Sequence, residues 1–84
     1  MRHIDNLSNT YDRNQGLALE FKFPNGYGAS VIKGPHTYGG KKGLWELAVL
    51  EQGLICYDTP ITNDVLGHLT WEQVENTLDE IKKL

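Results

Sequence analysis

The chain has 84 residues, a charged fraction of 23% and a formal net charge of -3 at pH 7, which fit one small folded domain and exclude a disordered or collagen-like chain. The strongly basic balance of many nucleic-acid-binding proteins is absent, so direct nucleic-acid binding is not expected. Cys56 is the single cysteine, which excludes an internal disulfide and a thiolate zinc cluster and favours a reducing, intracellular setting.

The first residues of the chain lack the apolar segment of a signal peptide. No apolar run approaches the roughly 20 residues that a membrane-spanning helix needs. We therefore expect a soluble, cytoplasmic protein without membrane contact. Residues 1–16 show no sustained hydrophobic period and are expected to form a flexible N-terminal arm, whereas residues 17–84 are expected to form a single α+β domain.

Four strands are predicted after this arm. Residues 17–23 alternate apolar and polar side chains, which is typical of a half-buried strand. The sequence "PNG" follows and has the turn chemistry of a hairpin, with a return strand at residues 27–33. Residues 44–51 and 54–59 are the third and fourth predicted strands, with a tight turn between them.

The third predicted strand carries apolar side chains on both faces, which indicates a central strand or a face that meets a partner chain. A domain of this size buries only a modest core, so self-association would extend it. We therefore expect a homo-oligomer whose interface includes Trp45, Leu47 and Val49, which share one face of this strand.

The strongest local pattern lies at the C-terminal end. Thr70 is a natural N-cap and Gln73 follows three residues later, which predicts a capping box. Apolar residues then recur every three or four positions, which predicts an amphipathic helix. The resulting order β-β-β-β-α favours a two-layer α+β fold, in which a four-stranded antiparallel meander is packed by one C-terminal amphipathic helix.

A polar stretch from Lys33 to Lys42 separates the second and third predicted strands. It contains three lysines, three glycines and no acidic residue. Glycines let backbone N–H groups approach an anion, and lysines supply positive charge for phosphate. The alternative is a solvated hairpin connection without a site. The candidate ligand-binding residues are Lys33, His36, Thr37, Tyr38, Gly39, Gly40, Lys41 and Lys42.

Other chemistries find little support in the sequence. The polar stretch is no P-loop, because it lacks the required glycine–lysine spacing and no helix follows it. Cys56 lies in an apolar strand without an activating motif, so a buried inert thiol is expected. The three histidines are far apart and fit no zinc spacing. We expect no catalytic residues, no metal site and no cofactor.

Three blocks of the sequence, "NGYGASVI", "YGGKKGLWELAVL" and "YDTPITNDVLGHLT", resemble a group of small accessory proteins of tailed phages and prophages. The resemblance covers roughly residues 21–84 and brings no catalytic residue with it. It implies a small viral protein in the host cytoplasm that acts by binding. Such proteins block host defence enzymes or sequester the nucleotides that those defences use as signals.

These observations lead to the expectation of a non-enzymatic anti-defence protein that sequesters a nucleotide- or phosphate-type ligand at residues 33–42. One alternative is an anti-CRISPR-like inhibitor that offers the acidic helix face, including Glu72, Glu75 and Asp79, to a host defence protein. A small nucleotide-cleaving enzyme and a structural or assembly protein of the virion are further alternatives.

Overall fold

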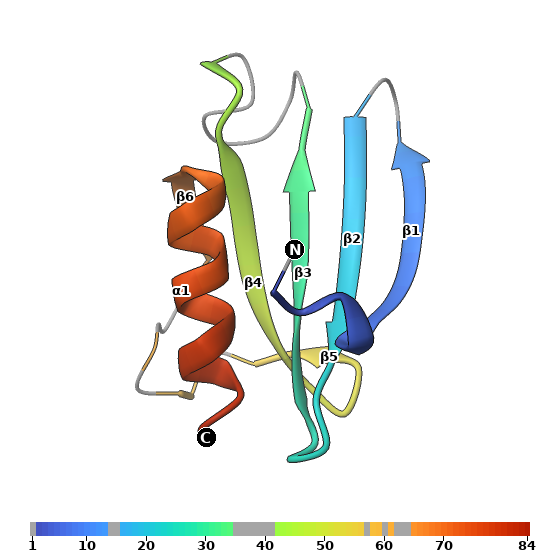
Figure 1. Cartoon of the computed structure of the whole chain (residues 1–84), viewed down its shortest axis with the longest axis vertical. Coiled ribbons are helices and arrows are strands. Elements are labelled where there is room, and N and C mark those ends of the chain that lie inside the picture. The colour runs from blue at the N-terminus through green and yellow to red at the C-terminus, as the bar shows by residue number, and fades with distance from the viewer. Residues whose placement is uncertain (1, 14–15, 35–41, 57, 60, 62–64) are drawn as a thin grey trace.

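The computed structural model describes residues 2–13, 16–34, 42–56, 58–59, 61 and 65–84. An antiparallel sheet packs against one C-terminal helix, so the fold is α+β (Figure 1). The elements are η1 (Ile4–Asn6), β1 (Leu7–Arg13), β2 (Gly16–Lys22), β3 (Tyr27–Lys33), β4 (Trp45–Glu51), β5 (Leu54–Ile55), β6 (Leu66–Leu69) and α1 (Trp71–Ile81). Within these ranges, no helix is both long and apolar enough to cross a membrane.

The predicted fold class is confirmed, but the described residues form a sheet of six strands rather than four. Strands β1 to β5 lie in chain order, and each neighbouring pair is antiparallel. Strand β4 pairs with β3 along one side, and on its other side it pairs with both β6 and β5. Strand β6 contacts β4 near Trp45, whereas β5 contacts it near Glu51. The fourth predicted strand is therefore much shorter than residues 54–59.

The expected flexible arm at residues 1–16 is largely part of the sheet. Strand β1 pairs with β2 from Leu7 to Arg13, and its register shifts between Leu7 and Asn9. The polar sequence of β1 has no apolar period from which a strand could be predicted. An edge strand can still form, because it gains backbone hydrogen bonds even where its side chains add little apolar burial. The segment before β1 crosses the helix-bearing face of the sheet (Figure 1).

Arg2 and His3 fasten this segment to α1 in what we call the N-terminal clasp. The Arg2 guanidinium donates to Asp79 at 2.9 Å, and the Arg2 backbone N–H donates to the Glu75 carboxylate at 2.7 Å. The His3 ring is buried, with Nε2 3.0 Å from the Asp79 carboxylate and 3.3 Å from the Glu75 carbonyl oxygen. Because both groups are acceptors, His3 Nε2 is the donor. The clasp therefore satisfies carboxylates that the sequence presents as free.

The helix begins where the sequence predicts. Thr70 Oγ1 accepts the Gln73 N–H at 3.2 Å, and the Gln73 side chain accepts the Thr70 N–H at 2.8 Å. The capping box is thus complete and the prediction is confirmed. It satisfies backbone donors that the first turn of a helix leaves unpaired.

The helix C-terminus is capped by a residue from the distant turn between β2 and β3. The Asn25 side-chain amide donates to the carbonyl oxygens of Ile81, Lys82 and Leu84 at 2.9, 3.2 and 3.1 Å. The Asn25 side-chain oxygen accepts the Tyr27 N–H at 3.0 Å, which also shapes the turn. One asparagine therefore joins a β-turn to the end of α1.

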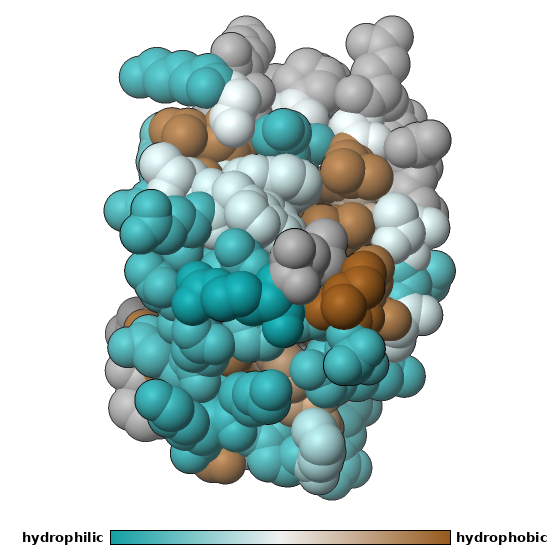
Figure 2. Space-filling model, viewed as in Figure 1, coloured by the Kyte–Doolittle hydropathy of each residue, from teal (hydrophilic) through white to brown (hydrophobic). Residues whose placement is uncertain are grey.

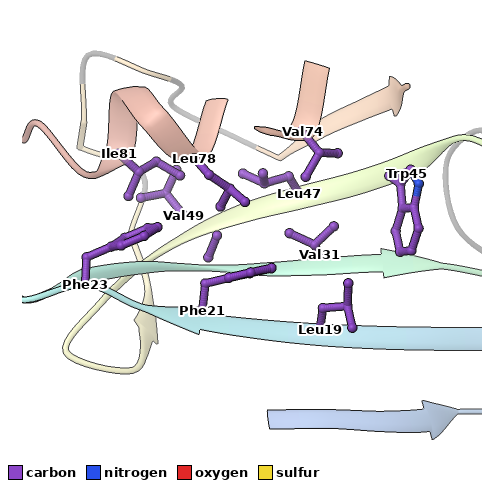
Figure 3. Packing of buried hydrophobic residues seen from close by; sticks show 11 residues of the cluster. Leu19, Phe21, Phe23, Val31, Trp45, Leu47, Val49, Val74, Leu78 and Ile81 are labelled. Carbon is purple, nitrogen blue, oxygen red and sulfur yellow. The ribbon is translucent and has the colours of Figure 1, made fainter. Parts of the chain in front are cut away.

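The core lies between the sheet and α1 (Figure 3). Leu78 and Ile81 of the helix meet Leu47 and Val49 of β4, with Phe21 of β2 beneath them. All five side chains are at most 1% exposed. The apolar stripe of the helix thus packs against the apolar face of the strands, and together they form one buried layer.

The expected interface face of the third strand is part of this core. Trp45, Leu47 and Val49 are 8%, 0% and 1% exposed, respectively, and pack inside one copy of the chain. They offer no surface to a partner. The physical reason is that α1 covers this face of β4, so the apolar surface that self-association would have buried is already buried.

Candidate functional site

Lys33 and two tryptophans gather at the end of the sheet where the polar stretch begins. Lys33 ends β3, Trp45 begins β4 and Trp71 begins α1, so three elements meet here. The Lys33 ammonium lies 4.6 Å from the centroid of a Trp45 ring, which is a cation–π contact. The Trp45 and Trp71 rings are 5.1 Å apart and tilted by 57°. We call these three residues the tryptophan–lysine cluster.

The cluster contains both tryptophans of the chain. Trp45 is 8% exposed and belongs to the core, whereas Trp71 and Lys33 are half-buried at its rim. A ligand at this end would therefore meet the Lys33 side chain and the exposed part of Trp71, but little of Trp45.

The chain matches no protein-family model, no curated protein and no solved structure. The candidate site therefore rests on its geometry. Lys33 lies in the tryptophan–lysine cluster, and Lys42 is exposed at the other base of the polar stretch. The remaining candidates (His36, Thr37, Tyr38, Gly39, Gly40 and Lys41) lie outside the described residues.

Sequence reasoning missed the contact between Lys33 and Trp45, although a signal for it exists. Lys33 follows Ala29 and Val31 at a spacing of two, and both of those residues are fully buried. Because strand side chains alternate, Lys33 occupies the core-facing side of β3 at its end. A lysine in such a position buries its methylene chain and places its ammonium on a neighbouring group, here the indole of Trp45.

The acidic face of α1 is less free than its sequence indicates. Glu75 and Asp79 are engaged by the N-terminal clasp, whereas Glu72 and Glu80 are exposed. Figure 2 shows a mostly hydrophilic surface over α1 and hydrophobic surface gathered over η1 and β2. A partner of the acidic face would therefore meet Glu72 and Glu80 without displacing the clasp.

A hollow of about 290 Å³ lies at the opposite end of the sheet, beside the turn between β2 and β3. The turn between β4 and β5 closes it, because the Gln52 N–H donates to the Gly26 carbonyl at 2.8 Å. Its lining consists of Phe21, Lys22, Phe23, Gly26, Tyr27, Gly28, Leu50, Gln52 and Gly53. None of these residues was among the predicted site residues, because the hollow forms only when two turns that are distant in the sequence meet.

Tyr27 and Glu51 share this end of the sheet as direct neighbours across β3 and β4. The Tyr27 phenol donates a hydrogen bond to Glu51, and the carboxylate charge opposes formation of the phenolate, so the pKa of Tyr27 lies above its usual value of 10.0. Within the described part of the chain, no group of three His, Cys, Asp or Glu side chains is arranged to hold a metal ion.

We expect the Tyr27 phenol to ionise above pH 10 in an absorbance titration of the folded protein. The folded state holds this proton more tightly than the unfolded state does. Its contribution to stability is therefore present below about pH 10 and is lost as pH rises through the raised pKa. The signal of Tyr27 is isolated by subtracting the titration of Tyr27→Phe, and Glu51→Gln should lower the pKa. A Tyr27 midpoint that Glu51→Gln does not move would contradict the assignment.

Proposed function

We propose that the chain is a non-enzymatic binding protein that holds a small anion of the nucleotide or phosphate type at residues 33–42. The context implied by its resemblance is that of a phage accessory protein that sequesters a signal of host defence. The protein would act by sequestering the ligand, without chemical turnover.

The observation that carries this proposal is the placement of Lys33. Its ammonium lies on the Trp45 ring at the base of the polar stretch, and an exposed lysine, Lys42, lies at the other base. A lysine held by an aromatic ring loses less conformational entropy on meeting a phosphate than a free one does. Trp71 beside it supports a ligand with a planar base, because indole rings stack on bases.

The proposal is tested by measuring tryptophan fluorescence during titration with mono-, di- and cyclic nucleotides and with inorganic phosphate. Both tryptophans lie in the tryptophan–lysine cluster, so the fluorescence reports on this end of the molecule. We expect a saturable change, with a parallel rise in melting temperature because the ligand binds the native state. Lys33→Gln and Lys42→Gln should each weaken binding by about tenfold, equivalent to ~1.4 kcal/mol.

A matched control keeps the change of charge away from the site. Glu80→Gln also alters the charge by one unit, at an exposed position of α1 nine residues beyond Trp71, and should leave the affinity unchanged. If none of these ligands changes the fluorescence or the melting temperature, the loop-site proposal is abandoned. If a bound nucleotide is recovered chemically altered, the protein is an enzyme and the non-enzymatic part of the proposal is wrong.

The second candidate function is inhibition of a host defence protein through the acidic face of α1. Exposed Glu72 and Glu80 favour it, because they remain free for a basic partner while the clasp engages Glu75 and Asp79. Charge reversal at Glu72 and Glu80 should abolish binding to such a partner and spare nucleotide binding. A structural role in the virion instead predicts an extended oligomer that binds no small ligand.

A further inference from the structure

The end of the sheet opposite the polar stretch carries strongly exposed apolar side chains. Leu54 is 75% exposed and Ile55 is 53% exposed. Both belong to β5, a two-residue strand whose described partner is β4. Exposed apolar residues on an edge strand are a recurrent site of pairing with another chain. This surface is separate from the proposed ligand site and does not depend on it.

Ile55 continues a row of residues that crosses one face of the sheet. It pairs with Leu50 of β4, which pairs with Gly28 of β3, which pairs with Lys22 of β2. The last three of these residues line the hollow of about 290 Å³. Because paired residues share a face of the sheet, the exposed Ile55 side chain and the hollow lie side by side on this face.

The charges around this surface are arranged for contact with a copy of itself. Lys22 is exposed on the hollow. Glu51 and Asp58 are exposed on a second, shallower hollow of about 330 Å³, which Leu54 and Ile55 also line. The row of paired residues is therefore basic at its β2 end and has acidic residues beside its β5 end. In a two-fold contact, the pairing of Lys22 with an acidic residue of the partner occurs twice, once on each side of the axis.

We propose that this surface binds a second copy of the chain in a two-fold dimer. Ile55 of each copy packs into the hollow of the other, and Leu54, on the opposite face of β5, packs beside it. Lys22 of each copy faces Asp58 of the other, because Glu51 already accepts the Tyr27 phenol. The contact involves the end of the sheet and β5, and it leaves the core face of β4 inside each subunit.

The mass of the protein in solution tests the dimer. Sedimentation equilibrium from about 1 µM to about 1 mM should show a rise from monomer to dimer. The double variant Leu54→Ser, Ile55→Ser should dimerise only at concentrations at least about tenfold higher than the original protein. Ile4→Ser is the matched control, because Ile4 of η1 is 56% exposed but lines neither hollow, and it should leave dimerisation unchanged.

A charge exchange tests the docking geometry. Lys22→Glu should weaken the dimer about tenfold by setting like charges against each other. Adding Asp58→Lys in the same chain should restore the affinity, because the exchanged charges meet again across the two-fold axis. Circular dichroism verifies that each variant is folded. A monomer at every concentration, or a dimer that the double serine variant leaves intact, overturns the proposal.

Discussion

Replacing Gly28 by alanine is expected to disrupt the sheet and reduce the free energy of unfolding by more than about 4 kcal/mol, at the upper end of single-residue effects. An alanine Cβ at this position would lie 2.1 Å from the Phe21 carbonyl oxygen and 3.1 Å from its carbonyl carbon. Both atoms belong to the backbone of β2, so no side chain can rotate to relieve the clash. The two central strands would have to separate or slip in register.

The size of the domain makes such a loss severe. A folded chain of this length has a free energy of unfolding of about 4–12 kcal/mol. Chemical denaturation followed by circular dichroism should therefore find that Gly28→Ala unfolds at a much lower denaturant concentration than the original protein. If its stability were within about 1 kcal/mol of the original protein, β2 and β3 could not approach as closely at Gly28 as the structure has them.

Gly26→Ala is the matched control for this experiment. Gly26 has φ of +88°, and an added Cβ would meet nothing within 4 Å. The substitution should cost about 1–2 kcal/mol, because only the left-handed backbone conformation opposes it. The two glycines lie in one hairpin, so the difference between the variants isolates the steric clash from backbone strain.

Replacing Asn25 by aspartate is expected to cost about 2–3 kcal/mol at neutral pH, the range of hydrogen bonds to charged groups. The new carboxylate keeps an acceptor for the Tyr27 N–H but loses the donor that meets the carbonyl oxygens of Ile81, Lys82 and Leu84. It also places a negative charge at the negative end of the helix dipole. Asn25→Ala, which adds no charge, should cost less, about 1–2 kcal/mol.

The pH dependence of this variant has a definite sign. The carbonyl oxygens favour the protonated carboxyl group, so its pKa in the folded state should lie above the usual value of about 3.9. The penalty is therefore present at neutral pH and should diminish as pH falls through that raised pKa. Urea denaturation of Asn25→Asp and the original protein, at neutral pH and at a pH below the raised pKa, measures this penalty. An equal loss of stability at the two pH values would show that the charge of the carboxylate plays no part.

Asn76→Asp provides the matched replacement elsewhere. The Asn76 side-chain oxygen accepts a hydrogen bond from the Arg2 guanidinium at 3.0 Å. A carboxylate there should be neutral or slightly stabilising, since it faces a cation. The contrast between the two asparagines separates the local environment from the chemistry of the substitution.

The parts of the fold that follow from short-range pattern could be predicted from the sequence. Strict alternation in residues 17–23, the turn chemistry of "PNG" and the Thr70–Gln73 capping box each depend on neighbours within a few positions. Strand β6 could not be predicted this way, because it is four residues long, contains a glycine and has His68 at φ of +56°. Its formation depends on pairing with β4, which is a tertiary effect.

The candidate site could be predicted only in part. The local composition indicated the lysines at residues 33–42, but the cation–π contact of Lys33 joins residues from two strands and could not be predicted from it. The clasp was missed for a similar reason, because Arg2 and His3 contact residues 72–77 positions away along the chain. Long-range pairings of side chains leave no periodic trace in a sequence.

The clasp has a consequence for the order of events during synthesis. Arg2 and His3 are made before Glu75 and Asp79, so the partners of the clasp do not yet exist while β1 to β4 are being synthesised. At about 5–20 residues per second, the apolar face of these strands stays uncovered for seconds before α1 reaches it. Loop closure over such separations slows folding further. The apolar face of β2 to β4 is therefore exposed during that interval, which docking of α1 and the N-terminal segment ends.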